Sequence, residues 1–176
     1  MNTEKHVIYV PTEIQLALLF KQAGVPKLRT QRLMYLAQGL HYMMFGSGCF
    51  GAPIRLLRTG PRVQNVWEEW FEMEHKYTLQ NADSDLCELA AHMTQVFQTF
   101  SNQELHDLIE QHIHNFKGWK FVPEHLMEDV FTNFYHGPKL EKYFHNLNEE
   151  ARLMFEDFRR KHPEKCSDVP HTLKLY

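Results

Sequence analysis

LRTQRLMYLAQGLHYMMFGSGCFGAPIRLLRTGPRVQNVW, residues 28–67, contains the series of elements from which the fold can be argued. Its first half has an apolar stripe at helical spacing, formed by Leu33, Leu36, Ala37, Leu40 and Met44. That spacing predicts an amphipathic helix, which Gly46 ends. An extended segment at residues 54–57 and a tight bend at Gly60-Pro61 follow, because glycine and proline interrupt regular structure.

A helix is predicted on each side of this stretch. Before it, residues 12–15 (TEIQ) have the form of a capping box, in which Thr12 accepts from a first-turn amide and Gln15 bonds back. Gly24 marks the end of that helix. After the bend, the helical spacing predicts a helix whose buried face is formed by Val63, Val66, Trp67 and Trp70.

Further helices are predicted towards the C-terminus. One has an apolar face formed by Leu86, Leu89, Ala90, Met93, Phe97 and Phe100. A second capping box, at residues 101–104, opens a helix that turns His112 inward. Two more helices are predicted from Pro123 and from about Asn146. The fold class is therefore mostly α, a compact multi-helix domain with a small extended or β element near residues 50–58.

Composition limits the functional classes. A chain of 176 residues builds one core, and its formal net charge of -3 is not that of a general nucleic-acid binder. The three cysteines, Cys49, Cys87 and Cys166, are widely separated and form no Cys-x-x-Cys pair, which favours free thiols in a reducing compartment. We find neither a secretory signal nor an apolar run long enough for a membrane span, so we expect a cytoplasmic protein without a membrane partner.

Charge is segregated along the chain. Residues 14–67 contain seven basic residues and no acid, whereas residues 68–116 contain ten acids and one lysine. One interpretation is that the two halves pair within the fold. The other is a bipolar surface that steers a charged partner, with Arg55, Arg58 and Arg62 around the bend as a contact site for carboxylate or phosphate.

Catalytic chemistry has little support in the sequence. Cys49 with His41 is the only nucleophile and base that we considered, and a phosphate-binding glycine loop is absent. A metal-assisted hydrolase would use His106, Glu110 and His112. We expect no catalytic residue, no metal and no cofactor.

An ordered set of features resembles the Panacea (SocA-like) antitoxin domain of bacteria and phages. Residues 33–38 (LMYLAQ), the glycine turn with Phe50, and residues 54–63 with the bend resemble its first elements. The later features are Trp67, and then Ser101, Leu105, His112 and Trp119 in the family's order. Two positions depart from the pattern: Leu57 replaces a large aromatic, and Arg62 interrupts Gly-Pro-Val and adds positive charge.

The resemblance implies a non-enzymatic antitoxin that neutralises a cognate protein toxin by direct binding. The Panacea-like domain would span residues 12–136, and residues 137–176 would form a C-terminal helical extension and tail. The motif residues with a structural role would be Tyr35, Gln38, Gly60, Pro61, Trp67 and His112. The tryptophans are expected mainly in the core, except Trp119, which is the candidate for partial exposure and for an anchoring role beside the three arginines.

Several alternatives stay open. The SocA branch implies a proteolytic adaptor that delivers its toxin to a protease, with residues 162–176 as a docking arm. A DNA-binding repressor lacks a clear helix-turn-helix, so we do not expect nucleic acid as a partner.

Overall fold

The computed structural model describes residues 9–45, 47–79, 83–116 and 118–122. They form α1 (Thr12–Gln22), α2 (Lys27–Phe45), β1 (Ile54–Leu57), β2 (Gly60–Val63), α3 (Gln64–Glu69), α4 (Met73–Lys76), α5 (Ser84–Val96), α6 (Asn102–Ile113) and a 3-10 helix at His114–Phe116. The expected mostly α fold with a small β element is confirmed. The helices predicted from Pro123 and Asn146, and the extension at residues 137–176, lie outside the described residues.

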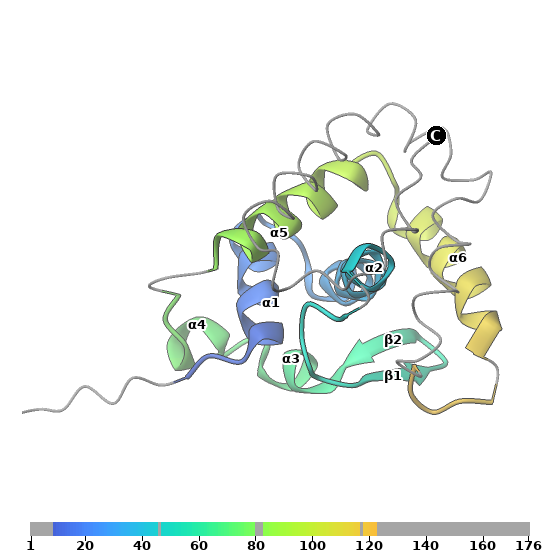
Figure 1. Ribbon diagram of the computed structural model, residues 1–176, viewed down its shortest axis with the longest axis horizontal. Coiled ribbons are helices and arrows are strands. Elements are labelled where there is room, and N and C mark those ends of the chain that lie inside the picture. Colours follow the sequence, from blue (N-terminus) through green and yellow to red (C-terminus); the bar gives the residue numbers. More distant parts are fainter. Residues whose placement is uncertain (1–8, 46, 80–82, 117, 123–176) are drawn as a thin grey trace, which may run out of the picture.

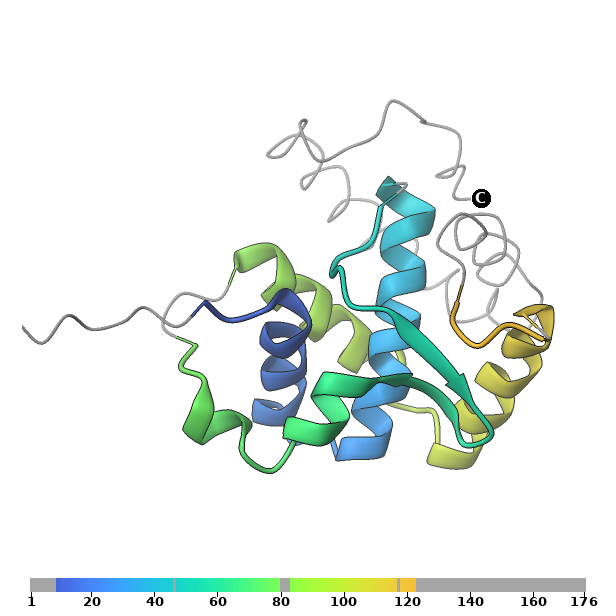
Figure 2. The same ribbon diagram turned by 90° about the horizontal axis from the view of Figure 1, so that it is seen from below.

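The α2 helix is the centre of the fold. It is seen end-on in Figure 1 and from the side in Figure 2, and α1, α5, α6 and β2 all contact it. Every residue from Thr30 to Leu40 is buried. The prediction of an amphipathic α2 is therefore wrong, because the side of the helix that carries its polar residues is also covered.

Two buried glutamines of α2 explain how this polar side is accommodated. Gln31 Oε1 accepts from the amide of Val63 at 2.7 Å, and its Nε2 donates to the Val63 carbonyl at 3.3 Å. Gln38 Oε1 accepts from the amides of Cys49 and Phe50, and its Nε2 donates to the Phe50 carbonyl at 2.8 Å. The two side chains lie two helical turns apart and therefore share a face of α2. They hold both ends of the segment that contains the β-hairpin.

β1 and β2 form an antiparallel hairpin, with Ile54 opposite Val63 and Leu57 opposite Gly60. The turn lies at Arg58-Thr59, so the prediction of a bend at Gly60-Pro61 is wrong by two residues. Gly60, with φ of +118°, begins β2 in a conformation that L side chains rarely adopt. The turn thus requires a glycine at position 60, but this glycine is the residue that follows the turn and is not one of the two turn residues.

Residues 120–122 add a third extended segment that the sequence did not predict. The amide of Leu56 donates to the Lys120 carbonyl at 2.8 Å, and the amide of Val122 donates to the Ile54 carbonyl at 2.9 Å. Phe121 forms an isolated antiparallel bridge with Arg55. The chain therefore returns to the hairpin after α6.

The two predicted capping boxes have different outcomes. Ser101 and Glu104 form both reciprocal bonds of a capping box at the start of α6, as predicted. The box at Thr12 is wrong: Pro11 is the N-cap of α1, Thr12 already lies in the helix, and Gln15 Nε2 donates to the Val10 carbonyl at 2.8 Å. The helix starts one residue earlier than the signature indicates.

The α5 and α6 helices pack as their spacing predicts. The six apolar residues predicted from Leu86 to Phe100 are all buried, and His112 turns inward from α6. The helix after the hairpin differs from its prediction. Val63 belongs to β2, Trp70 follows α3, and the side chain of Trp67 is only partly buried. α4 is a single turn that we did not predict.

Candidate partner-binding surface

The outer face of the hairpin carries two arginines in register. Along each strand side chains alternate between the faces, so Ile54 and Val63 enter the core while Arg55 and Arg62 point outward together. Their Cα atoms are cross-strand partners. Like charges in this arrangement repel and destabilise a sheet. Arg58, in the turn between the strands, is exposed and adds a third positive charge.

A stack of cations and aromatic rings continues from Arg62. Its guanidinium carbon lies 4.0 Å from the centroid of the Trp67 ring, and Lys27 Nζ lies 3.9 Å from the same centroid. Lys27 Nζ is also 4.9 Å from the ring centroid of Phe71, which is 76% exposed. Distances of this size are those of cation–π interactions. The expectation that Trp67 lies in the core is wrong, because its ring serves as the platform for two surface cations.

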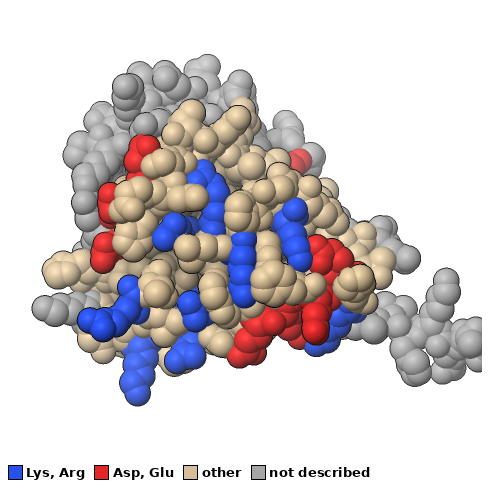
Figure 3. Space-filling view, turned by 180° about the vertical axis from the view of Figure 1, so that it is seen from behind, with Lys and Arg blue, Asp and Glu red and all other residues tan. Residues whose placement is uncertain are grey.

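Most basic residues between positions 14 and 67 form no ion pair with an acid in the part of the chain that the structure describes. Of the seven basic residues between positions 14 and 67, only Lys21 forms an ion pair with another described residue, with Glu74 at 2.8 Å. Figure 3 shows Lys and Arg side chains spread across the middle and lower left of one face, with Asp and Glu grouped at its lower right and left edge. Among the described residues, therefore, the ion pair of Lys21 with Glu74 joins the two halves, and positive side chains gather in the middle of this face with acids on two sides of it.

Four of the six residues expected to have a structural role, Tyr35, Gln38, Pro61 and His112, are buried behind this surface, whereas Trp67 lies on it. Tyr35 Oη lies 2.6 Å from His112 Nδ1, and both side chains are buried where α2 meets α6. Gln38 holds the segment before β1, and Pro61 is buried in β2. Gln31, which sequence reasoning missed, acts in the same way as Gln38, and its spacing of seven from Gln38 is the signal that could have identified it. These residues shape the surface without lining it.

Trp119 is half exposed, as expected, with 50% of the residue's surface accessible. Its amide donates to the Phe116 carbonyl at 3.0 Å, which fixes the backbone at the end of the 3-10 helix. Two residues later Phe121, 44% exposed, bridges to Arg55. The structure therefore brings the segment after the 3-10 helix, with Trp119 and Phe121, to the hairpin. Anchors of one contact surface would require such an arrangement.

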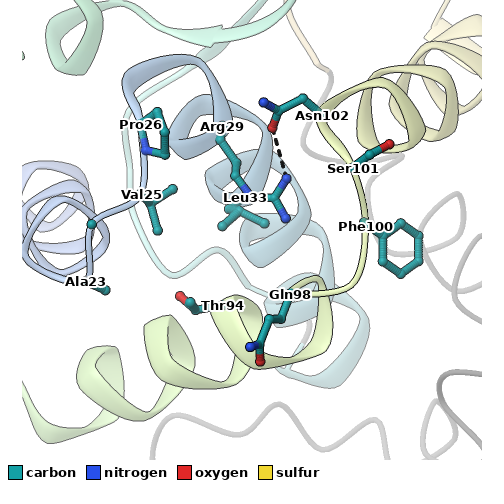
Figure 4. A pocket seen from close by; sticks show the side chains of 11 residues that line it. Ala23, Val25, Pro26, Arg29, Leu33, Thr94, Gln98, Phe100, Ser101 and Asn102 are labelled. Atoms are coloured by element: carbon teal, nitrogen blue, oxygen red, sulfur yellow. Dashed lines mark hydrogen bonds between the residues drawn. The ribbon is translucent and has the colours of Figure 1, made fainter.

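A groove of about 400 Å³ lies between the α1–α2 turn and the α5–α6 turn (Figure 4). Arg29 lines it and donates to Asn102 Oδ1 at 3.0 Å and to the Phe97 carbonyl at 2.7 Å. Burial lowers the pKa of the Arg29 guanidinium. Arg29 thus joins α2 to the α5–α6 turn.

The structure brings together two residues of the alternative metal site, His106 and Glu110, but not His112. His106, Asp107 and Glu110 lie near one another on α6, whereas His112 is buried against Tyr35. His106 Nε2 is 3.2 Å from Glu110, and its Nδ1 is 3.2 Å from the guanidinium of Arg32. A guanidinium beside a ligand nitrogen repels a bound cation. The arrangement thus disfavours the trio of His106, Glu110 and His112.

Cys49 and His41 each contact a group elsewhere in the structure. Cys49 Sγ donates to Gln38 Oε1 at 3.2 Å, and His41 Nδ1 lies 2.5 Å from the Ser47 carbonyl. Burial raises the pKa of the Cys49 thiol to about 12. The thiolate is the nucleophilic form of cysteine, so this pKa disfavours catalysis by Cys49.

No helix among the described residues has the length and apolar character of a membrane span. Comparisons with protein-family models, with curated proteins and with solved structures find no match to this chain.

Proposed function

We propose that this chain is an antitoxin-type binding protein that neutralises a cognate protein toxin by direct contact through its arginine hairpin, defined as Arg55, Arg58 and Arg62 on β1–β2. The observation that carries the proposal is the register of Arg55 opposite Arg62, with no acidic partner among the described residues. Two like charges held together on an exposed face repel each other and lower the stability of the free protein. A partner that carries carboxylates would relieve this repulsion.

The resemblance of residues 12–136 to the Panacea domain supplies the class of partner. The residues that carry this resemblance build the scaffold, for example Tyr35 against His112 and Gln38 against Phe50. A shared scaffold with a variable charged surface suits a group of antitoxins that meet different toxins. Arg62, a departure from the family pattern, lies on the proposed contact face.

The physical requirements for neutralisation are modest. A stable complex buries about 800 Å² on each partner, and a few arginine and aromatic anchors supply most of its binding energy. The arginine hairpin, with Trp119 beside its far edge, offers such anchors. We place the complex in the cytoplasm, and the free thiols of Cys49 and Cys87 support a reducing compartment.

Co-expression with the product of the adjacent reading frame tests the proposal. We expect that product to arrest growth alone, and to become harmless and co-purify when this chain is present. The triple variant Arg55→Ala, Arg58→Ala and Arg62→Ala is expected to fold and to lose the protection. A harmless neighbour that never co-purifies would contradict the proposal, as would full protection by the triple variant.

A further inference from the structure

One continuous strip joins the third extended segment, the hairpin and the N-terminus of α2. Each step is a direct contact or a register pair: Phe121 bridges Arg55, Arg55 faces Arg62, and Arg62 stacks on Trp67. Trp67 also carries Lys27, which reaches Phe71. We call these six residues the cationic strip. It has an exposed phenylalanine at each end and three cations between.

The surroundings of the strip change along its length. At the hairpin end, Arg58 adds to the positive charge. At the other end, Glu68 on α3 and Glu72 after it are exposed on either side of Phe71 in sequence. Gln64 Nε2 donates to Glu68 Oε1 at 2.7 Å and leaves its charge in place. The surface is therefore basic at the hairpin, whereas at Phe71 the single cation Lys27 is accompanied by the exposed Glu68 and Glu72 of the adjoining sequence.

Trp67 organises the centre of the strip. Lys27 and Arg62 both lie within about 4 Å of the Trp67 ring, which restricts these two long side chains in the free protein. Less side-chain conformational entropy is therefore lost when a ligand binds. The strip is thus preorganised, with its two central cations fixed against one ring.

We infer that the cationic strip binds a bipolar peptide segment of the toxin, with carboxylates over the arginine hairpin and an apolar, basic-flanked part over Phe71. This inference rests on the proposed function. Complementary charge at both ends fixes the direction in which the segment lies. Nucleic acid, which is anionic along its whole length, would meet Glu68 and Glu72 at one end, so the surface favours a polypeptide.

Synthetic peptides test this without a known toxin. The probe has one half of glutamates and one half of alternating leucine and lysine, made in both chain directions. Its control has the same composition with glutamate and lysine interleaved, and a mixed-sequence DNA duplex is the third ligand. In fluorescence anisotropy at about 0.15 M salt, where long-range attraction is screened, we expect one direction of the bipolar peptide to bind about tenfold more tightly than the control. The duplex should bind more weakly than that peptide.

Matched variants locate the contact. In the double variant Arg55→Ala and Arg62→Ala, the affinity for the bipolar peptide should fall to that for the interleaved control. Lys76→Ala on α4 removes one positive charge elsewhere and should leave the affinity for the bipolar peptide unchanged. Phe71→Ser should weaken binding severalfold, and Tyr9→Ser, at an equally exposed aromatic outside the strip, should leave it unchanged.

Equal affinity for both peptide isomers, or tighter binding of the duplex, would overturn the inference. So would an unchanged affinity in the arginine double variant. These results would leave toxin neutralisation intact if co-expression still protects cells, which would place the toxin on another surface. Conversely, a preference for the bipolar peptide without any neutralisation would leave the strip as a peptide site and reject the antitoxin proposal.

Discussion

Replacing Arg55 by glutamate should make the protein more stable while it weakens partner binding. Arg55 and Arg62 are cross-strand partners on an exposed face, so Arg55→Glu turns a repulsive pair into an attractive one. Because the pair is solvent-exposed and screened, the gain should be only about 0.5–1 kcal/mol. For a chain of this length it corresponds to a rise in Tm of about 1–4 °C. Urea unfolding at low and high salt measures it, and the gain should shrink as salt screens the pair.

The opposite effect on binding makes this variant diagnostic. Surface residues kept at a cost in stability are expected where function needs them. Arg58→Glu is the matched control: it makes the same charge change in the turn, where no cross-strand partner exists, and should weaken binding with a smaller effect on stability. A loss of stability in Arg55→Glu would refute the reasoning, because it would mean that Arg55 is held by favourable contacts within the fold.

Three further predictions concern the scaffold. Gln31→Ala should cost about 2–4 kcal/mol in urea unfolding, because the amide and carbonyl of Val63 both lose a partner, whereas Gln22→Ala at the exposed end of α1 should cost little. Burial lowers the pKa of His92 to about 4, whereas the unfolded state takes up this proton at about pH 6.5. The free energy of unfolding should therefore fall by about 2 kcal/mol from about pH 7 to about pH 5. His92→Leu should flatten this pH dependence, and an unchanged slope would contradict the prediction. Cys49 should react with iodoacetamide about a thousandfold more slowly in the folded than in the unfolded protein, and rapid labelling of the folded state would reopen a catalytic role.

Local patterns predicted much of the fold. The apolar spacing of α5 and the Ser101–Glu104 box depend on residues that are close in sequence, and both are as expected. The same reasoning found the extended segment of β1 and placed the arginines around one bend. The Thr12 signature failed because Pro11 could begin the helix one residue earlier.

Contacts between distant residues could not be predicted in this way. The sequence of α2 predicts that its polar side faces solvent. The partners of Gln31 and Gln38 are backbone groups of a later segment, which the local pattern does not indicate. Lys27 contacts Trp67 forty positions away, and Phe121 bridges to Arg55 after α3, α4, α5, α6 and the 3-10 helix. The segregated charges left internal pairing and an exposed charged surface both open, and only the folded register shows that Arg55 lies opposite Arg62, with no acid paired to either among the described residues.

Calorimetric titration of the purified toxin into this protein and into its hairpin variants tests the central claim most directly. We expect tight binding by the wild-type chain, a loss of at least about tenfold in Arg55→Glu, and little change in Lys76→Ala. Binding of equal strength to all three proteins would contradict the claim that the arginine hairpin is the contact surface.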